Sequence, residues 1–224
     1  PTVPTGARGW VPSVPVPIGP PTTEQPSGQS TIGTLSLLGS SIVGAWFLLC
    51  WFVSGLSVSR GSRPAPAEWI SEARRVAARL GVAGGVDVRG VRNGGSPRVA
   101  GLFRSVVMMP ASANKWTTEE RQAAFVHELT HIRRHDRRTQ TIAQLACAIY
   151  WFNPLAWYAA AGLARERERA CDDEVLRVGV KPSAYAALLL DLAQRPRWTP
   201  ATALSMARPS AIEGRLLMIL GEAV

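Results

Sequence analysis

Cysteine is scarce in this sequence, and the three that occur, Cys50, Cys147 and Cys171, lie far apart. An odd and scattered set is not a disulfide framework, and the lack of a CxxC pair argues against a thiolate zinc site. We therefore expect a chain from a reducing compartment, in which Cys50 serves as a small apolar residue.

Acidic residues are the minority among the charged ones. The chain has 16 Asp and Glu against 25 Lys and Arg, a net charge of +9, and Arg supplies nearly all of the positive side. Such basicity suits nucleic acid, anionic lipid or only solubility. No basic patch alternates with aromatic residues and no recognition helix is evident, so we expect no direct nucleic-acid binding. The arginines are expected to face lipid headgroups or solvent.

Charge is absent altogether from residues 32–53, which are rich in Leu, Ile, Val, Trp and Phe. About 20 apolar residues are enough to cross the hydrocarbon core of a bilayer. A signal peptide would need a basic segment before a shorter apolar run, and the nearest upstream charge is Glu24. A buried core helix is the other alternative. We predict a transmembrane helix within residues 30–59, after a Pro-rich disordered, extracytoplasmic linker at residues 1–29.

The charges that flank this helix predict its orientation. Arg60 and Arg63 follow it closely, whereas only Arg8, far away, precedes it. The positive-inside rule therefore places the C-terminal side in the cytoplasm. Because the sequence begins with Pro1, we also expect it to be a fragment or a processed form of a longer chain.

Residues 60–224 are predicted to form one mostly helical α+β domain with a small sheet. A capping box of Thr117 and Glu120 marks the start of one helix. We expect an extended peptide to pair with an exposed edge of the strand at 105–109. The predicted helices cover residues 67–80, 117–135, 155–178, 182–193 and a last one from about 210; the predicted strands cover 86–91, 98–102 and 105–109.

The segment from His127 to His131 reads H-E-x-x-H. On a helix its two histidines share one face, so both imidazoles can bind one ion, and Glu128 can take a proton from a water on that ion. Zinc suits this work because it is not redox-active and accepts nitrogen and oxygen ligands. Two surface histidines on an ordinary helix are the alternative. We predict Zn²⁺ as the cofactor and Glu128 as the catalytic base.

A catalytic zinc needs a third protein ligand. His135 follows on the same predicted helix, but on a straight helix it would lie about 12 Å from His127, too far to share an ion. Glu168 and Asp172 form an E-x-x-x-D pair at helical spacing. We predict that Glu168 binds the metal and that Asp172 accepts the second ring N–H of a bound histidine. A solvated helix face with Arg–Glu pairs is the alternative. We interpret the neighbouring Glu166 and Asp173 as salt-bridge partners that point elsewhere on the helix.

Three motifs in order make the sequence similar to a known family. They are HELTHIRRHD at 127–136, WFNPLAW at 151–157 and RERACD at 167–172. Together they resemble the BlaR/MecR-type M56 metallopeptidases, and the resemblance runs from about residue 32 to the C-terminus. It implies a gluzincin-like cytoplasmic zinc domain between transmembrane helices, with zinc on His127, His131 and Glu168 and with Glu128 as the base. The best-known members of that family cleave themselves and trigger removal of a transcriptional repressor when an outer sensor binds antibiotic.

A penicillin-binding sensor is not expected in this sequence. Ser112-Ala113-Asn114-Lys115 fits the S-x-x-K pattern, but no S-D-N or K-T-G accompanies it. The chain ends at Val224 without an outer sensor domain, so the β-lactam stimulus is not carried over from the family.

A second uncharged run covers residues 139–164 and is interrupted at Asn153-Pro154. The proposed ligands lie on both sides of this run, so one ion can bind them all only if both ends share one side of the membrane. Arginines at both ends agree. We predict a helical hairpin that does not cross the bilayer. It belongs either to the core of the zinc domain or to the cytoplasmic membrane interface.

These features predict a regulatory, membrane-anchored zinc metalloendopeptidase that cleaves itself or a cytoplasmic protein such as a repressor. One alternative is a housekeeping membrane peptidase of the HtpX or CAAX-protease kind, which shares both metal motifs. Another is a non-enzymatic signalling module that keeps zinc for structure. The expected partners are the lipid bilayer and a protein or peptide substrate.

Overall fold

The computed structural model describes residues 28–91, 95–101, 105–194 and 209–221. By its contacts the chain divides into residues 1–36 and residues 37–224, and the boundary falls within the first helix. The linker expected at residues 1–29 lies almost wholly outside the described residues. The residues of the H-E-x-x-H and E-x-x-x-D motifs all belong to the second unit.

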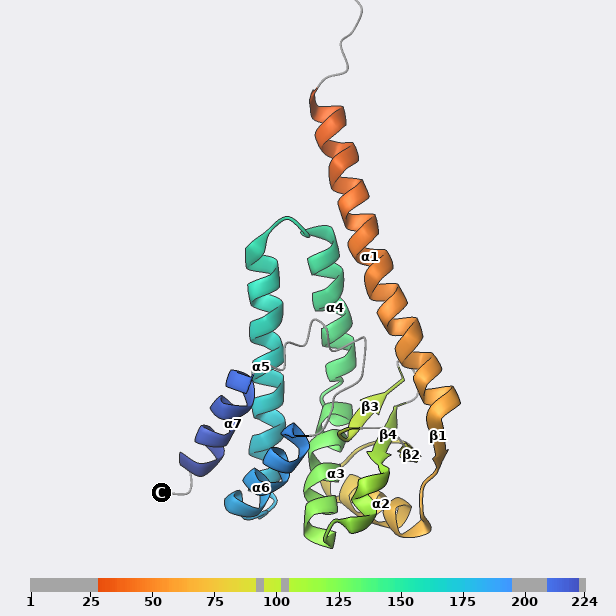
Figure 1. The fold of residues 1–224 in the computed structure, drawn as a ribbon, viewed down its shortest axis with the longest axis vertical. Coiled ribbons are helices and arrows are strands. Elements are labelled where there is room, and N and C mark those ends of the chain that lie inside the picture. Colours follow the sequence, from red (N-terminus) through yellow and green to blue (C-terminus); the bar gives the residue numbers. More distant parts are fainter. Residues whose placement is uncertain (1–27, 92–94, 102–104, 195–208, 222–224) are drawn as a thin grey trace, which may run out of the picture. The chain divides into compact units, whose positions relative to one another are not determined.

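Helix α1, Gly28–Gly61, contains the apolar stretch that the sequence singled out (Figure 1). Its residues Gly33–Val53 are long and apolar enough to cross a membrane, and none of its most apolar window is buried in the protein. Among the described residues, it is the one helix with this property. The prediction of one N-terminal membrane helix therefore agrees with the structure in length and composition.

A four-stranded mixed sheet follows, in the order β1-β2-β4-β3. Strands β2 and β4 are parallel, and the two outer pairs are antiparallel. Strand β4 lies between two neighbours, so the prediction of an exposed edge at residues 105–109 is wrong; β3 holds the edge on that side. The strands are β1 Ser62–Pro64, which the sequence did not indicate, β2 Asp87–Val91, β3 Arg98–Ala100 and β4 Val106–Pro110.

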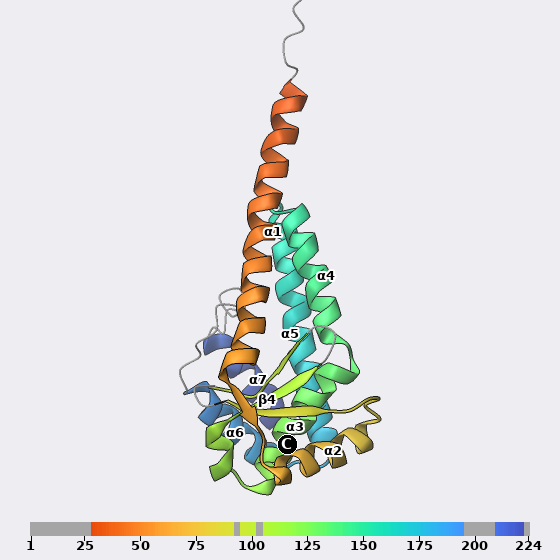
Figure 2. The same cartoon turned by 90° about the vertical axis from the view of Figure 1, so that its right-hand side faces the viewer.

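Helices α2, Ala67–Leu80, and α3, Thr118–Arg133, pack against each other below the sheet (Figure 2). Helix α2 ends at Gly81, whose φ of 66° is the left-handed conformation that glycine adopts readily. The predicted capping box between Thr117 and Glu120 starts α3. Buried Arg121 fastens α3 to α2, because it donates two hydrogen bonds of 2.9 Å to the Glu72 carboxylate. The helix that carries H-E-x-x-H is thus held firmly in the core.

The predicted helix at 117–135 is too long, because α3 ends at Arg133 and the chain then turns. The turn is made by His135, the one non-glycine residue with positive φ (57°) in the described chain. Helix α4, Asp136–Ile149, starts there, and α5, Pro154–Arg177, returns beside it as a hairpin (Figure 1). The predicted break at Asn153-Pro154 is confirmed: the Asn153 side chain caps α5 by accepting from the backbone N–H of Leu155 at 2.9 Å.

The outer part of this hairpin is not a buried core hairpin. Its large apolar side chains are mostly exposed, whereas Cys147 and Ala148 are the buried apolar residues of α4. The remaining helices, α6 at Pro182–Ala193 and α7 at Pro209–Gly221, pack against each other. Helix α6 also contacts α3, and α7 also contacts α5. The chain is therefore mostly helical with a small mixed sheet, as predicted.

Candidate metal centre

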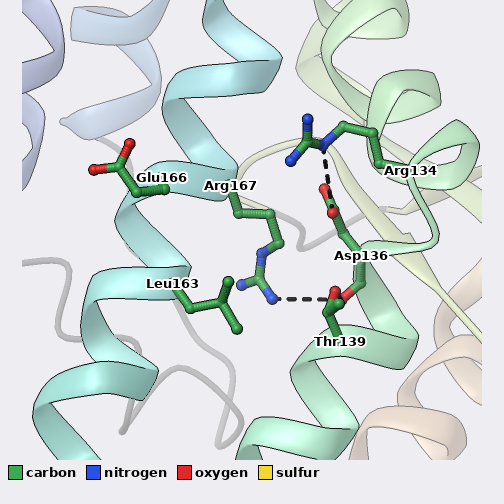
Figure 3. A pocket seen from close by; sticks show the side chains of 6 residues that line it. All are labelled: Arg134, Asp136, Thr139, Leu163, Glu166 and Arg167. Atoms are coloured by element: carbon green, nitrogen blue, oxygen red, sulfur yellow. Dashed lines mark hydrogen bonds and ion pairs between the residues drawn. The ribbon is translucent and has the colours of Figure 1, made fainter.

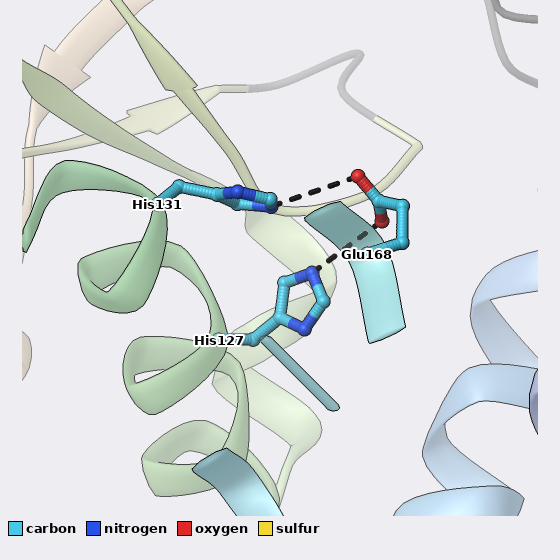
Figure 4. Close-up of side chains that lie close together, drawn as sticks. All are labelled: His127, His131 and Glu168. Carbon is cyan, nitrogen blue, oxygen red and sulfur yellow. Dashed lines mark ion pairs between the residues drawn. The ribbon is translucent and has the colours of Figure 1, made fainter. Parts of the chain in front are cut away.

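Three side chains converge where α3 passes α5 (Figure 4). The Nε2 atom of His127 lies 3.6 Å from Oε2 of Glu168, and the Nε2 atom of His131 lies 3.7 Å from Oε1 of the same carboxylate. One ligand atom from each of the three residues lies within 4.8 Å of the others. The structure thus brings together three residues that are 41 positions apart at most in the sequence and that the motifs had singled out.

The spacing of these atoms fits a tetrahedral zinc ion. Zinc lies about 2.1 Å from a nitrogen or oxygen ligand, so neighbouring ligands of a tetrahedron are about 3.4 Å apart. The distances of 3.6 Å and 3.7 Å from the two imidazole nitrogens, each to a different oxygen of Glu168, are close to this value. Two imidazoles and one carboxylate leave a fourth position for water or substrate, which is the arrangement of a catalytic rather than a structural zinc site.

The second nitrogen of each imidazole faces a carboxylate. Nδ1 of His127 lies 3.2 Å from Asp172, which is buried, and Nδ1 of His131 lies 2.8 Å from Asp136. A carboxylate at Nδ1 fixes the tautomer with its hydrogen there and leaves Nε2 free to bind a metal. The sequence predicted this geometry for Asp172. It missed Asp136, although a carboxylate five residues after the second histidine was visible in the motif.

Glu128 is buried on α3 between the two histidines in sequence. Within the described part of the chain, its carboxylate forms no hydrogen bond or ion pair. The guanidinium of Arg98, on edge strand β3, interacts electrostatically with the Glu128 carboxylate. Burial lowers the pKa of Arg98 and outweighs the opposite effect of Glu128, so the pKa of Arg98 is lowered. A carboxylate without a fixed hydrogen-bond donor remains available to accept a proton from water.

Two further residues belong to this centre and were not predicted. Tyr185 of α6 donates a hydrogen bond of 2.7 Å to Asp172, and its oxygen also lies 3.0 Å from Nδ1 of His127. Arg215 of α7 binds Asp172 through two hydrogen bonds of 2.7 Å and 2.6 Å and lies 3.4 Å from Glu168. Both are far from the metal motifs in the sequence, and neither has a spacing that would have marked it.

The electrostatics of the centre favour positive charge between the histidines and Glu168. Burial lowers the pKa of His127, but hydrogen bonds to Asp172 and Glu168 outweigh it and raise the pKa to about 10. For Glu168, burial raises the pKa, but His127, His131 and Arg215 outweigh it and hold the pKa well below the usual range. A proton on His127 therefore occupies the place that a metal ion would take, and the two compete.

A second group of potential ligands shares one residue with the first. His131, Asp136 and Cys171 also lie within 4.8 Å of one another, and the Cys171 sulfur is 3.3 Å from Nδ1 of His131. Burial, together with Glu168 and Asp136, raises the pKa of the Cys171 thiol well above its usual value. A protonated thiol is a poor zinc ligand, and Asp136 already engages this Nδ1. The first group is therefore the better candidate for a metal site.

The other polar residues near the motif lie outside the centre. His135 is exposed, and its ring nitrogen faces the carbonyl of Ile132 at 3.0 Å. Glu166 forms an ion pair of 2.7 Å with Arg169, as its interpretation as a salt-bridge partner predicted. Beside the centre, a pocket between the start of α4 and α5 is lined by Arg134, Asp136, Thr139, Leu163, Glu166 and Arg167 (Figure 3).

Comparison with known proteins bears directly on this arrangement. Residues 23–219 match the family model described as BlaR1 peptidase M56. The chain belongs to this family. The regulatory protein BlaR1 of Bacillus licheniformis is 33% identical over 82 residues, and the methicillin resistance mecR1 protein of Staphylococcus aureus is 28% identical over 84 residues. Each match covers 37% of this chain and 14% of the relative, so the chain aligns with a small part of those proteins.

Proposed function

We propose that this M56 family member is a membrane-anchored zinc metalloendopeptidase of regulatory type. The observation that carries the proposal is the convergence of the His127 and His131 imidazoles on the Glu168 carboxylate, with ligand atoms within 4.8 Å. Glu128 lies on the same helix as the two histidines and is the catalytic base. A gluzincin-like fold is part of this proposal, since the third ligand is a glutamate from a following helix.

The residues of the chain have distinct tasks in hydrolysis. When bound, zinc polarises the scissile carbonyl and makes a water more acidic at neutral pH. Glu128 accepts a proton from this water, the water oxygen adds to the carbonyl carbon, and the C–N bond breaks. Glu128 then delivers the proton to the leaving amine, so it ends the cycle unprotonated as it began. Asp172 and Asp136 hold the imidazoles in the tautomer that binds through Nε2.

The membrane anchor is the Gly33–Val53 stretch of α1, with the zinc domain on the cytoplasmic side. Support for this orientation comes from Arg63, Arg74 and Arg75, which follow the stretch, whereas the segment before it is nearly free of basic residues. The names of these relatives describe a regulatory protein and a resistance protein. Self-cleavage, or cleavage of a cytoplasmic protein such as a repressor, is consistent with such a role.

A peptide substrate has one strand beside the centre with which to pair. Strand β3 pairs only with β4 among the described strands, and its Arg98 interacts electrostatically with Glu128. An extended peptide added along β3 would pass close to the metal ligands. Arg137 lies against this strand, with its guanidinium 3.4 Å from the carbonyl of Val99, and a bound peptide would compete with that contact.

The test is a cleavage assay on zinc-loaded wild type and Glu128→Gln. The amide keeps the size of the side chain but cannot act as a base, so zinc content should stay at one per chain while the cleavage rate falls by about 10²–10⁴-fold. Cleavage at the wild-type rate would refute the role of Glu128. A wild type that holds zinc and cleaves neither itself nor a co-expressed repressor would favour the non-enzymatic signalling module. The match to a regulatory family argues against the housekeeping alternative.

A further inference from the structure

The outer half of the α4–α5 hairpin leaves most of its large apolar side chains exposed within the described part of the chain. We propose that this hairpin, residues 139–164, is a re-entrant element that inserts its tip into the bilayer beside α1 from the cytoplasmic side. The inference rests on the proposed membrane anchor, but not on zinc or on catalysis. It identifies the bilayer itself as the partner of this surface.

The first observation is the exposure of large apolar side chains on both arms and at the tip. No charged residue occurs between Thr139 and Ala164. Phe152 at the tip is 61% exposed, and Leu155 and Tyr158 on α5 are 71% and 72% exposed. A contiguous apolar surface of this kind marks a protein or membrane interface. The other exposed apolar residues of the hairpin are Ile142, Leu145, Ile149, Tyr150, Trp151 and Leu163.

The second observation is that the turn pairs several of its own backbone polar groups. The N–H groups of Tyr150 and Asn153 donate to the carbonyls of Ala146 and Tyr150 at 2.8 Å and 2.9 Å. The N–H of Leu155 donates to the Asn153 side chain, and Pro154 has no N–H to satisfy. The carbonyl of Trp151 accepts a hydrogen bond of 2.9 Å from the Trp157 indole. Irregular backbone survives in hydrocarbon only when it is paired in this way.

The third observation is contact between the tip and the apolar stretch of α1. Ser40 donates to the carbonyl of Ile149 at 3.5 Å, and the rings of Phe47 and Trp157 are 6.4 Å apart. The Trp151 ring lies directly against Gly39, where a side chain would leave no room for it. Ser40 precedes Val53 by 13 residues, about 20 Å along a helix. If α1 spans the bilayer, the tip therefore reaches past the middle of a core about 30 Å thick.

The fourth observation is a pair of arginines at the base of the arms. Arg138 and Arg165 are the charged residues nearest the tip, each 12 residues or about 18 Å from the turn residues Tyr150 and Asn153. This length agrees with the depth given by Ser40. Both arginines are exposed, and neither forms an ion pair within the described chain. They are placed to bind anionic headgroups while the arms between them lie in hydrocarbon.

The test measures the depth of single fluorescent labels in vesicles. The parent protein is the full chain with Glu128→Gln, which prevents self-cleavage, and with Ala in place of Cys50 and Cys147. Cys171 stays because it is fully buried. This parent must take up no dye. An environment-sensitive dye is placed at F152C on the tip, at L48C on α1 and at L190C on α6, which is exposed but outside the hairpin. Y158C is a second hairpin position if F152C fails to fold. The vesicles contain phosphatidylcholine and phosphatidylglycerol.

The labels at residues 152 and 48 should be quenched by lipids that carry a quencher on the acyl chain, and they should be protected from iodide in the water. The label at residue 190 should be quenched by iodide and not by these lipids. Quenching of residue 152 by iodide, with residue 48 still quenched by lipid, would overturn the hairpin inference and leave the anchor intact. Protection of residue 152 from both quenchers would indicate a second copy of the chain and would also overturn it. Exposure of residue 48 to iodide would refute the anchor.

The arginines have their own control. Phosphatidylglycerol should deepen the label at residue 152 relative to vesicles of phosphatidylcholine alone, and R138Q/R165Q should abolish this difference. R177Q is the matched control, because Arg177 is exposed but lies at the far end of α5. An equal response of all three proteins to the anionic lipid would contradict headgroup binding by these two arginines.

Discussion

The Asp136 carboxylate lies 2.8 Å from Nδ1 of His131, although the two residues belong to different helices. The left-handed conformation of His135 ends α3 and turns the chain so that the first residue of α4 points back at the metal centre. Asp136 thus does for His131 what Asp172 does for His127. Each proposed imidazole ligand is oriented by a carboxylate from outside its own helix.

Replacing either carboxylate should weaken zinc binding without abolishing it. Asp136→Asn and Asp172→Asn each remove the acceptor that fixes an imidazole tautomer, so zinc affinity should fall by about 10–100-fold. Competition with a fluorescent chelator measures this change. The control is Asp173→Asn, on an exposed neighbour. An Asp136 variant with wild-type affinity would show that its contact with His131 has no part in metal binding.

The choice of third ligand is tested by two glutamates on the same helix. Glu168→Ala should lose stoichiometric zinc, because it removes one of three protein ligands. Glu166→Ala should keep it, because Glu166 pairs with Arg169 at the surface. Metal analysis of the purified variants decides the matter. Equal zinc content in both would rule out Glu168 as a ligand.

The metal-free chain should lose stability as pH rises. The pKa of His127 is raised from 6.5 to about 10 in the folded state, so its contribution is fully present below pH 6.5 and disappears as pH passes 10. One proton gives a slope of at most about 1.4 kcal/mol per pH unit. Zinc binds the neutral imidazole, so zinc stabilisation should grow across the same window. Denaturation curves in detergent measure both trends, and metal-free His127→Gln should lack the slope.

Arg215 should contribute strongly to stability although it lies outside the metal motifs. Arg215→Met removes the guanidinium partner of the buried Asp172 carboxylate and leaves it with Tyr185 and His127, so the change should cost about 3 kcal/mol of unfolding free energy. Arg215→Lys should restore part of the loss. Arg177 is exposed and pairs with the buried Glu174, which also pairs with Arg133, so Arg177→Met should cost about 1 kcal/mol or less. Equal losses for the two methionine variants, measured by denaturation, would contradict this account.

Local patterns carried most of what the sequence could predict. The capping box at Thr117, the break at Asn153-Pro154 and the limits of α2 and α6 depend on neighbouring residues, and all agree with the structure. Strand pairing depends on residues that are far apart in the sequence. For this reason β1 was missed and β4 was mistaken for an edge strand. Tyr185 and Arg215 reach the centre only through the packing of α6 and α7, and no local signal marks them. The proposed domain limits and ligand roles stay predictions.

The ligand set of the metal is the central claim, and X-ray absorption at the zinc edge tests it most directly. The account predicts one zinc per chain with only nitrogen and oxygen neighbours at about 2.0–2.2 Å. The competing group of His131, Asp136 and Cys171 would add a sulfur neighbour at about 2.3 Å. A spectrum without sulfur that Cys171→Ala leaves unchanged would support the proposed centre; a zinc–sulfur distance that vanishes in Cys171→Ala would contradict it.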